Sequence, residues 1–381
     1  MKPKKQIPVY GIVIIDLVLT VVFFGAFISY EYLLPHEGDS NGTVVLSGSD
    51  IDSSFALPSD SQTEKENNSN AETSAAPKAK TSASQSDSEA ETETQISAKI
   101  PSSRKKGSGN AAGNCRSNQN TQDMTADKSQ SDNISNTSSS DKVLNTYKSD
   151  NANITVYEKT FGEGSDKVTY YVADCYVTSA AEIKTYLAEN TYGKNIKQSI
   201  SEMDKATNSV ISINGDFYGN SESGIVIRNG VEYRNNVNNA DVCVLFKDGT
   251  MKTYSPSEYN AQEVISQGAW QAWSFGPSLL DGNGNILSSF NTNNFINSTN
   301  PRTALGYIAP GHYKFVVVDG RDKGYSKGVT ISELAAIMAK EGCKSAYNMD
   351  GGNSSMMTFK GQLVNKPSGN GREISDIIYI A

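Results

Sequence analysis

Hydrophobic and polar positions divide the chain into three parts. A largely apolar run extends from Ile7 to Leu34 and follows lysines at positions 2, 4 and 5. A helix needs about 20 apolar residues to cross a bilayer, and flanking basic residues favour the cytoplasmic side. The pattern therefore predicts a cytoplasmic tail over residues 1–6, one transmembrane helix over residues 7–34, and an extracytoplasmic remainder. A cleaved signal peptide is the competing interpretation, but its apolar region spans only about 7–15 residues.

The second part, residues 35–143, is polar and has scarcely an aromatic residue after Phe55. Ser, Thr, Asn, Asp, Glu and Lys dominate it. Such a segment cannot bury enough apolar surface to offset the entropy of ordering its chain. We therefore expect a disordered linker. The basic patch at residues 104–106 is typical of solvated linker charge, and contact with an anionic cell-surface polymer is the alternative.

The third part, residues 144–381, holds nearly all the aromatic and β-branched residues and has the size of one domain. Apolar and alternating runs predict strands at Ile154–Phe161, Val168–Val177, Ser209–Ile213, Val226–Arg228, Val242–Phe246, Met251–Tyr254, Ala304–Ile308, Tyr313–Val318, Ala346–Met349, Met356–Phe359 and Ile374–Ile380. Amphipathic runs predict helices at Ala180–Leu187, Ile196–Ala206 and Ser332–Lys340. Hairpins combined with helical crossovers predict an α/β to α+β fold, a single domain with a mixed sheet and packed helices.

Composition narrows the chemistry of this domain. The chain has two histidines, His36 and His312, which excludes a Ser-His-Asp triad or a multi-histidine zinc site in practice. Acid and base roles must therefore fall to carboxylates. The formal net charge of −8 argues against nucleic acid as a partner. Cys175, Cys243 and Cys343 lie in or beside apolar runs, where buried thiols are favoured over a disulfide, although the disulfide stays open.

Three polar clusters punctuate apolar strands near the C-terminus, at residues 300–306, 318–321 and 348–355. Charged residues and glycines at the ends of buried strands are costly for a core. They are also how open sheets present binding groups at their rims. The spacing therefore predicts that the functional site is built from these three clusters.

Ordered motifs in the third part resemble the phosphodiester glycosidase family. They are Ile213-Asn214-Gly215-Asp216-Phe217-Tyr218, Arg302-Thr303-Ala304-Leu305-Gly306, Asp319-Gly320-Arg321, Gly328-Val329-Thr330 before Glu333-Leu334-Ala335, and Asn348-Met349-Asp350-Gly351-Gly352-Asn353-Ser354-Ser355. The resemblance runs over roughly residues 211–379 and implies a hydrolase that acts on sugar-1-phosphodiester bonds. This chain departs from the family at Asn353, where a third glycine is usual, and at Asp216 and Arg321, where relatives often carry other residues.

The residue types suit that chemistry. Cleavage at the glycosidic carbon expels a phosphate monoester while positive charge develops on the sugar ring. Carboxylates can act as nucleophile or base, and the candidate catalytic residues are Asp350, Asp319 and Glu333. Arg302 can supply two parallel donors to phosphate oxygens. The further candidate substrate-binding residues are Asn214, Asp216, Thr303, Gly320, Arg321, Gly351, Gly352, Ser354 and Ser355.

Several of these residues also have a purely structural interpretation. Asp319-Gly320 is a favourable hairpin turn, and Glu333 near a helix start stabilises the helix dipole. Trp270 and Trp273 fit either a sugar-stacking platform or core packing. Function and structure therefore remain alternatives at these positions.

The sequence as a whole predicts a membrane-anchored, extracytoplasmic glycosidase that hydrolyses sugar-1-phosphodiester bonds in a cell-envelope glycopolymer such as an exopolysaccharide. Two other functions stay open. One is a non-catalytic module that binds phosphorylated glycans, and the other is a glycosyl or phosphoglycosyl transferase of envelope polymer assembly. No cofactor is assigned, although a carboxylate-rich pocket can hold Ca²⁺ or Mg²⁺. The metal and the oligomeric state are left unassigned.

Overall fold

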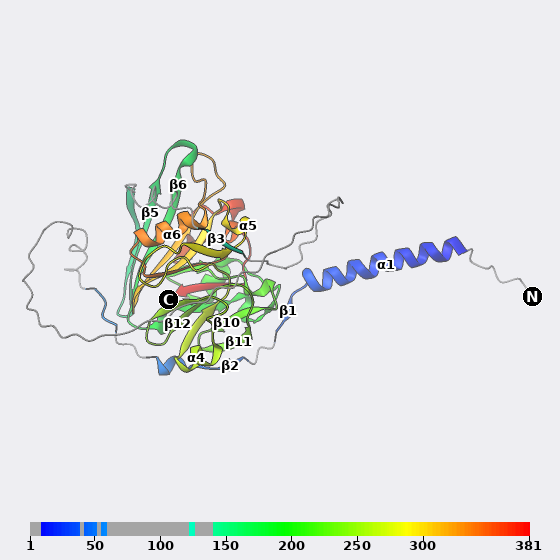
Figure 1. The fold of residues 1–381 in the computed structure, drawn as a ribbon, viewed down its shortest axis with the longest axis horizontal. Helices are drawn as coiled ribbons and strands as arrows, with labels where there is room; N and C mark the ends of the chain where they lie inside the picture. Colours follow the sequence, from blue (N-terminus) through cyan, green and yellow to red (C-terminus); the bar gives the residue numbers. More distant parts are fainter. Residues whose placement is uncertain (1–8, 39–41, 52–54, 59–121, 126–139) are drawn as a thin grey trace, which may run out of the picture. The chain divides into compact units, whose positions relative to one another are not determined.

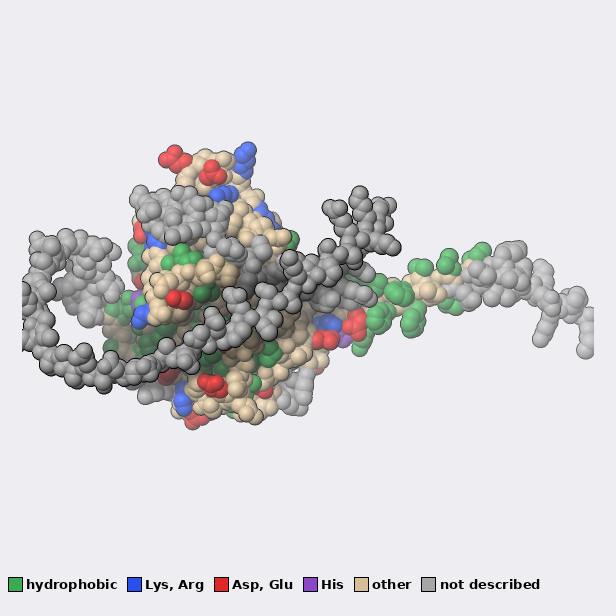
Figure 2. Space-filling model, viewed as in Figure 1, with side chains coloured by type: hydrophobic (Ala, Val, Ile, Leu, Met, Phe, Trp, Pro, Cys, Tyr) green, Lys and Arg blue, Asp and Glu red, His purple; other side chains and the backbone are tan. Residues whose placement is uncertain are grey.

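The computed structural model describes residues 9–38, 42–51, 55–58, 122–125 and 140–381. The first helix, α1, spans Val9–Tyr32 (Figure 1), and its described apolar side chains, such as Phe23 and Phe24, are exposed (Figure 2). Within the described ranges, no helix is long and apolar enough to cross a membrane. The predicted cytoplasmic tail and the start of the predicted span at residue 7 lie outside those ranges, so membrane crossing stays a prediction.

Three sheets make up most of the domain. Sheet 1 has the order β18-β16-β17-β6-β5-β4, with β4 Ser140–Lys148, β5 Ala152–Phe161, β6 Val168–Val177, β16 Arg302–Ala309, β17 His312–Val318 and β18 Ser345–Asn348. Sheet 2 has the order β13-β12-β14-β10-β11-β2, with β2 Thr43–Val44, β10 Gly224–Arg228, β11 Val231–Asn236, β12 Val242–Phe246, β13 Met251–Tyr254 and β14 Ala269–Trp273. Sheet 3 has the order β20-β19-β9-β21-β7, with β7 Lys184–Leu187, β9 Ile211–Asn214, β19 Met357–Phe359, β20 Gln362–Leu363 and β21 Asp376–Ile380.

Smaller elements complete the domain. Two short pairs join β1 His36–Glu37 to β8 Gly193–Lys194, and β3 Gln122–Thr125 to β15 Ser289–Thr292. The helices after α1 are α3 Ile200–Thr207, α4 Ala261–Ser266, α5 Asn294–Asn297 and α6 Ile331–Lys340. The fold is therefore rich in sheet, with few helices.

The strand pairs correct the predicted mixed sheet. Every pair in the described part of the chain is antiparallel. The predicted helix Ala180–Leu187 is also wrong, because it is a short 3-10 turn followed by β7. Residues of β7 alternate between half-buried and buried, and its Thr and Tyr favour a pleated strand. The combination of sheets with packed helices is confirmed.

The predicted disordered linker, residues 35–143, needs correction at both ends. β1 and β2 lie on the domain, and Leu46 and Ile51 are each 8% exposed within its main core. The few apolar residues at the start of this segment therefore suffice to dock it. At the other end, β4 already begins at Ser140 and pairs with β5. Residues 59–121 and 126–139 lie outside the described residues.

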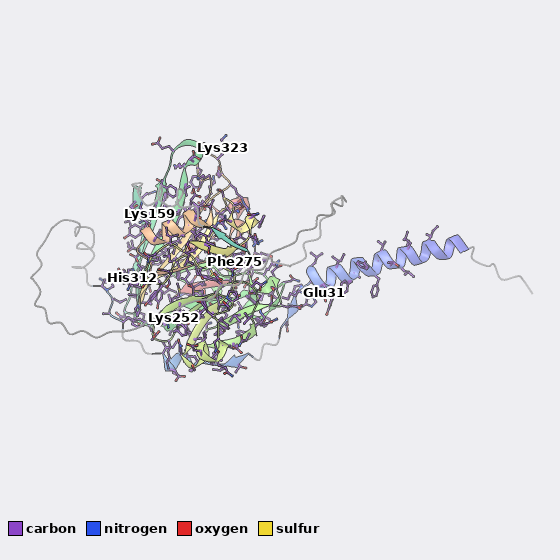
Figure 3. All side chains as sticks on the ribbon, in the orientation of Figure 1. Glu31, Lys159, Lys252, Phe275, His312 and Lys323 are labelled. Atoms are coloured by element: carbon purple, nitrogen blue, oxygen red, sulfur yellow. The ribbon has the colours of Figure 1, made fainter. Side chains whose placement is uncertain are left out.

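Sheet 1 is buried on both faces. Alternate residues of β6 point in opposite directions, with Val168 and Tyr170 in one core cluster and Tyr171 and Ala173 in another. The first cluster includes the buried face of α6, and the second includes residues of sheets 2 and 3. Near α6, Lys159 of β5 (Figure 3) forms an ion pair of 3.0 Å with Glu341. Sheet 1 therefore lies between α6 and the other two sheets.

The structure decides between the interpretations that the sequence left open for two tryptophans and three cysteines. Trp270 is 5% exposed and Trp273 is fully buried, both in the cluster between the sheets, so they pack in the core. Cys175, Cys243 and Cys343 are buried free thiols. Burial raises the pKa of each thiol above its usual range. These cysteines therefore behave as small apolar side chains rather than as reactive thiols.

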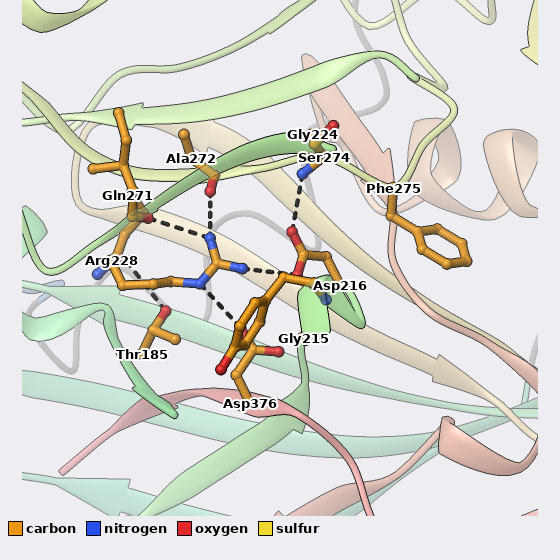
Figure 4. A network of polar contacts seen from close by, with 12 residues as sticks. Thr185, Gly215, Asp216, Gly224, Arg228, Gln271, Ala272, Ser274, Phe275 and Asp376 are labelled. Carbon is orange, nitrogen blue, oxygen red and sulfur yellow. Dashed lines mark hydrogen bonds and ion pairs between the residues drawn. The ribbon is translucent and has the colours of Figure 1, made fainter. Parts of the chain in front are cut away.

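Arg228 joins sheets 2 and 3 through a buried ionic network (Figure 4). Its Nη2 donates to Asp216 Oδ1 at 2.7 Å, and its Nε donates to Asp376 Oδ2 at 3.0 Å. Its Nη1 donates to the carbonyl of Ala272 on the neighbouring strand. All three charged side chains are 1% exposed. Burial raises the pKa of Asp376 to about 7, opposed by Arg228 and assisted by Asp216.

Replacing Arg228 by Met should destabilise the full-length protein by about 3–5 kcal/mol, because it leaves two buried carboxylates without their cation. The loss should be smaller at about pH 5 than at about pH 8. A raised carboxyl pKa means that the folded state retains a proton that the unfolded state releases, so stability falls as pH rises toward the folded pKa. Urea unfolding at the two pH values measures the effect.

The control is Arg234→Met, because Arg234 donates to the backbone carbonyls of Tyr218, Ser221 and Gly224. The loss of stability in Arg234→Met should therefore depend little on pH. An equal pH dependence in both variants, or a loss below about 1 kcal/mol for Arg228→Met, would contradict the role assigned to Arg228.

Candidate functional site

The three polar clusters meet at one edge of sheet 1, where β16 begins and β17 and β18 end, as the sequence predicted. β16 starts at Arg302, which pairs with Val318 at the end of β17, and Ala304 pairs with Asn348 at the end of β18. The backbone N–H of Gly352 then donates to the carbonyl of Pro301 at 2.9 Å. Antiparallel register therefore brings the start of one strand beside the ends of its two neighbours.

Asn214, at the end of β9, ties sheet 3 to this edge. Its Nδ2 donates to the carbonyl of Asp350 at 2.7 Å, and its Oδ1 accepts from Thr303 Oγ1 at 2.7 Å. The same oxygen accepts from the N–H of Met356 at 3.3 Å. Asn214 is 1% exposed and Thr303 is fully buried. The structure thus brings these two predicted residues to the site as its scaffold.

Asp350 lines a narrow crevice beside this scaffold, which in this structure has no room for a water molecule. The crevice is lined by Asn214, Gly215, Phe217, Asp350, Ile374, Ser375 and Asp376. Two larger hollows, of about 360 and 470 Å³, lie elsewhere on the described surface, near Tyr192 and near Tyr254. Two buried carboxyl groups, those of Asp350 and Asp376, line this crevice.

The Asp350 carboxylate is held by Arg372 and by its own turn. Oδ2 accepts from Arg372 Nη2 at 2.6 Å, and Oδ1 accepts from the N–H of Gly351 at 3.0 Å. Arg372 Nε also donates to Ser354 Oγ, and its guanidinium lies 4.7 Å from the centre of the Phe217 ring. Burial raises the pKa of Asp350, and the charge of Arg372 opposes that rise. Arg372 thus favours the ionised carboxylate.

Steric constraints explain two glycines of the Asp350 turn. A Cβ on Gly351 would lie 2.9 Å from the carbonyl oxygen of Pro301. Gly352 has a left-handed φ of 66°, which L side chains rarely adopt. Ser354 and Ser355 are fully buried after this turn, and Ser355 Oγ has no hydrogen-bond partner among the described residues. The predicted cluster is therefore a tightly packed turn, in which the Ser354 hydroxyl accepts a hydrogen bond from Arg372.

Asp319 lies at the same sheet edge but is not among the crevice residues. Its Oδ1 accepts from Asn365 Nδ2 at 2.7 Å, and its Oδ2 accepts from the N–H of Lys366 at 2.9 Å and from Tyr325 OH at 2.8 Å. It is 1% exposed, and burial raises its pKa. Both oxygens are engaged, so Asp319 holds the 365–366 segment against β17.

Glu333 and Gly320 also have structural positions. Glu333 accepts from the N–H of Thr330 at 2.7 Å and forms an ion pair of 3.2 Å with Lys327. It is thus the partner of the N-cap residue Thr330 in the capping box that begins α6. A Cβ on Gly320 would lie 2.8 Å from Gly328 Cα. Close approach of two chain segments therefore explains this glycine.

Arg302 is oriented differently from the prediction. It is 4% exposed, its Nε donates to the carbonyl of Val329 at 3.1 Å, and its Nη2 donates to the carbonyls of Ile296 and Ser298. Burial, assisted by nearby Arg321, lowers the pKa of Arg302 to about 10. The guanidinium that was expected to bind phosphate thus holds backbone turns to sheet 1.

Arg321 remains on the surface beside the Asp350 turn. Its Nη1 donates to Asn353 Oδ1 at 3.0 Å and its Nη2 donates to Asn300 Oδ1 at 2.8 Å. Asp216, by contrast, is buried in the Arg228 network, where it also accepts from the N–H of Tyr218 and of Ser274. Of these two predicted residues, the structure leaves only Arg321 accessible to a ligand.

The sequence analysis missed Arg372, Ser375 and Asp376. Arg372 and Ser375 lie just before β21 and Asp376 is its first residue. The predicted strand Ile374–Ile380 included Ser375 and Asp376 without attention to its polar start. A charged residue directly before a buried strand was the available signal. Among the described residues, no group of three or more His, Cys, Asp or Glu side chains could hold a metal ion.

The chain is similar in sequence to known proteins. Residues 207–381 match the family model described as phosphodiester glycosidase. The chain is 32% identical over 197 residues to the SPbeta prophage-derived uncharacterized protein YomE of Bacillus subtilis, a stretch covering 50% of this chain and 30% of that protein. It is 33% identical over 76 residues to the Bos taurus N-acetylglucosamine-1-phosphodiester alpha-N-acetylglucosaminidase, covering 20% of this chain and 14% of that enzyme.

The fold has a solved counterpart. The zebrafish N-acetylglucosamine-1-phosphodiester alpha-N-acetylglucosaminidase catalytic domain, auto-inhibited by its pro-peptide, matches with a TM-score of 0.50 and 17% identity, covering 64% of this chain and 87% of that one. The present chain spans less than a third of the length of the curated relatives above. Residues 207–381 are therefore similar to the phosphodiester glycosidase family.

Proposed function

We propose that this protein hydrolyses sugar-1-phosphodiester bonds in the crevice that contains Asp350. The observation that carries the proposal is the position of the Asp350 carboxylate, which Arg372 and the Gly351 N–H hold at a crevice lined by a second carboxyl group. The family match and the names of the relatives support the bond type. They also make N-acetylglucosamine the first sugar to test.

Each residue has a distinct task in this proposal. Arg372 has a side chain that is 41% exposed, so it can engage a phosphate oxygen from solvent while it contacts Asp350. Asp350 acts on the sugar, either by taking a proton from the attacking water or by attacking the sugar carbon itself. The bond between the sugar carbon and the bridging oxygen breaks, and the products are the free sugar and a phosphate monoester.

Asp350→Asn should reduce kcat by about 100-fold or more, because Asn has nearly the same size but cannot act as base or nucleophile. Binding of the phosphodiester should largely persist. The comparison variant is Asp319→Asn, which should lower the melting temperature more and kcat less, because Asp319 holds a chain segment. Turnover of a methyl phosphodiester of N-acetylglucosamine and thermal unfolding are measured together. Near wild-type turnover by Asp350→Asn would remove it from the chemistry.

Arg372→Lys and Arg302→Lys should separate substrate handling from folding. Lysine at 372 keeps the charge but loses the planar fork, so kcat/KM should fall by about 10-fold or more with little change in melting temperature. Lysine at 302 leaves buried carbonyls short of donors, which costs about 1–3 kcal/mol for each unsatisfied group, while the folded fraction keeps its activity. If Arg302→Lys lowered kcat/KM without loss of stability, and Arg372→Lys did the opposite, Arg302 would again be the phosphate ligand.

The same assays distinguish the other functions. Phosphoglycan binding without turnover by any variant would favour a binding module. Transfer of the sugar to an added glycan acceptor in preference to water would favour a transferase. Release of free sugar, lost in Asp350→Asn, supports hydrolysis.

We propose further that the domain is tethered at a membrane outside the cytoplasm and acts on an envelope glycopolymer. The apolar run from Ile7 to Leu34 and the lysines before it support the tether. Full-length protein should remain in carbonate-washed membranes, and paired Val22→Lys and Phe23→Lys substitutions should release it. Protease added outside intact cells should degrade the domain. Recovery of the unaltered protein in the soluble fraction would reject the tether.

A further inference from the structure

The guanidinium of Arg321 is an exposed positive charge that is held by neutral groups. Its side-chain hydrogen bonds in the described part of the chain go to two amides, Asn353 Oδ1 at 3.0 Å and Asn300 Oδ1 at 2.8 Å. The next residue, Asp322, forms an ion pair of 2.7 Å with Lys366 instead. A guanidinium has five N–H donors, and the two bonds to amides leave the others available to a ligand.

A second arginine adds positive charge on the same side of the turn. Arg302 donates to backbone carbonyls through Nε and Nη2. Burial lowers the pKa of Arg302 to about 10, the charge of Arg321 adds to this effect, and Glu333 opposes it. Two like charges that act on each other in this way are relieved by an anion bound beside them. This patch is therefore suited to an anion, although the chain as a whole has a formal net charge of −8.

The guanidinium of Arg321 is also held in place before any ligand binds. Arg321 has a left-handed φ of 61°, which few residues other than glycine adopt. Asn300 Nδ2 donates to the carbonyl of Ser298 at 3.1 Å and to its Oγ at 2.9 Å, so Asn300 Oδ1 is directed at Arg321. The amide of Asn353 is packed against Gly369, where a Cβ would lie 3.0 Å from its Nδ2. A donor that is fixed in advance loses less entropy when it binds.

Arg321 and Arg372 lie against the same short turn. A Cβ at Gly352 would lie 3.1 Å from Arg321 Nη2, so this guanidinium rests on the turn. Arg372 donates to Ser354 Oγ and, at 2.6 Å, to Asp350 Oδ2. Gly352 and Ser354 are two positions apart, which corresponds to at most about 7 Å of extended chain. One extended substrate can therefore reach both guanidiniums.

We propose that Arg321 binds a second phosphate group of the substrate, which follows the scissile phosphodiester along a polymer. This proposal rests on the proposed function. A polymer joined by sugar-1-phosphodiester bonds carries a phosphate at every repeat, so it presents one phosphate to Arg372 and the next to Arg321. The planar fork of arginine matches phosphate oxygens. The preferred bond is therefore an internal one of a polymer with several phosphates, rather than a diester with a single phosphate.

The test compares three substrates that differ only in the alcohol of the diester. N-acetylglucosamine-1-phosphate is joined to glycerol, to glycerol phosphate or to glyceric acid. For the full-length protein, kcat/KM should be about 10-fold or more higher with glycerol phosphate than with glycerol, which is the usual effect of one hydrogen bond between charged groups. Glyceric acid should give a smaller gain. A gain with glyceric acid that equals or exceeds the gain with glycerol phosphate would make the ligand a carboxylate and overturn the assignment to phosphate.

Arg321→Gly tests the residue itself. It should reduce the ratio of kcat/KM between the glycerol phosphate and glycerol diesters to about one, because the fork is removed. The melting temperature should change little, because glycine adopts the left-handed φ without strain. The matched control is Lys323→Ala, which removes an equal charge from the same exposed loop (Figure 3) and should keep the ratio. An equal loss in both variants would mean diffuse attraction and would reject the contact with Arg321.

A binding measurement separates this proposal from the proposed function. Titration calorimetry compares glycerol 1,3-bisphosphate with glycerol 3-phosphate. The wild type should bind the bisphosphate about 10-fold or more tightly, and Arg321→Gly should bind the two alike. If no diester is cleaved but binding follows this pattern, hydrolysis fails while the second phosphate site stands. If the diesters are cleaved at equal kcat/KM and the two phosphates bind alike to the wild type, hydrolysis stands and the role of Arg321 is rejected.

Discussion

The guanidinium of Arg228 is buried, and two buried carboxyl groups and a backbone carbonyl compensate for its lost hydration. Its partners come from two directions: Asp376 on sheet 3 with Asp216 in the segment after β9, and a carbonyl of β14 on sheet 2. An unpaired buried charge would cost several kcal/mol, so the two sheets are constrained to one relative position. The close approach of Gly215 to Asp376 follows from that constraint.

The crevice is a consequence of this junction. β9 and β21 are neighbours in sheet 3, so the segment after Asn214 and the start of β21 lie side by side. Asn214 then connects the same segment to Thr303 and to the Asp350 turn at the edge of sheet 1. Segments at the ends of strands of sheets 1 and 3 therefore line one small polar crevice, and the ionic network of Arg228 lies beside it through Asp376.

The distribution of arginines shows how burial assigns roles. Arg228 and Arg302 are almost completely buried and donate to carboxylates or backbone carbonyls. Arg321 and Arg372 lie at the surface on either side of the Asp350 turn. A guanidinium can bind a phosphate from solvent only if its donors are accessible, so the exposed pair is better placed than the buried pair. The chemical type of the side chain is the same in all four.

Local signals in the sequence were sufficient for several of the strands and for the meeting of the three polar clusters. Apolar runs delimited β6, β12 and β13 correctly, since side-chain burial with strand periodicity is a property of neighbouring residues. The polar clusters near residues 300, 320 and 350 meet where β16 begins and β17 and β18 end, and their motifs carry the family resemblance. Asp350 was identified on the same basis.

Only the tertiary structure decided which polar residues face the crevice. The contact between Arg228 and Asp376 joins residues that are 148 positions apart, and the contact between Asn214 and Asp350 spans 136 positions. Hydrophobic periodicity reports which face of a strand is buried but not which distant strand covers it. The same limit explains why Arg302 was taken for a ligand residue and Arg372 was overlooked. Their sequence neighbourhoods are similar in kind, and it is the packing of other segments over Arg302 that removes its donors from solvent.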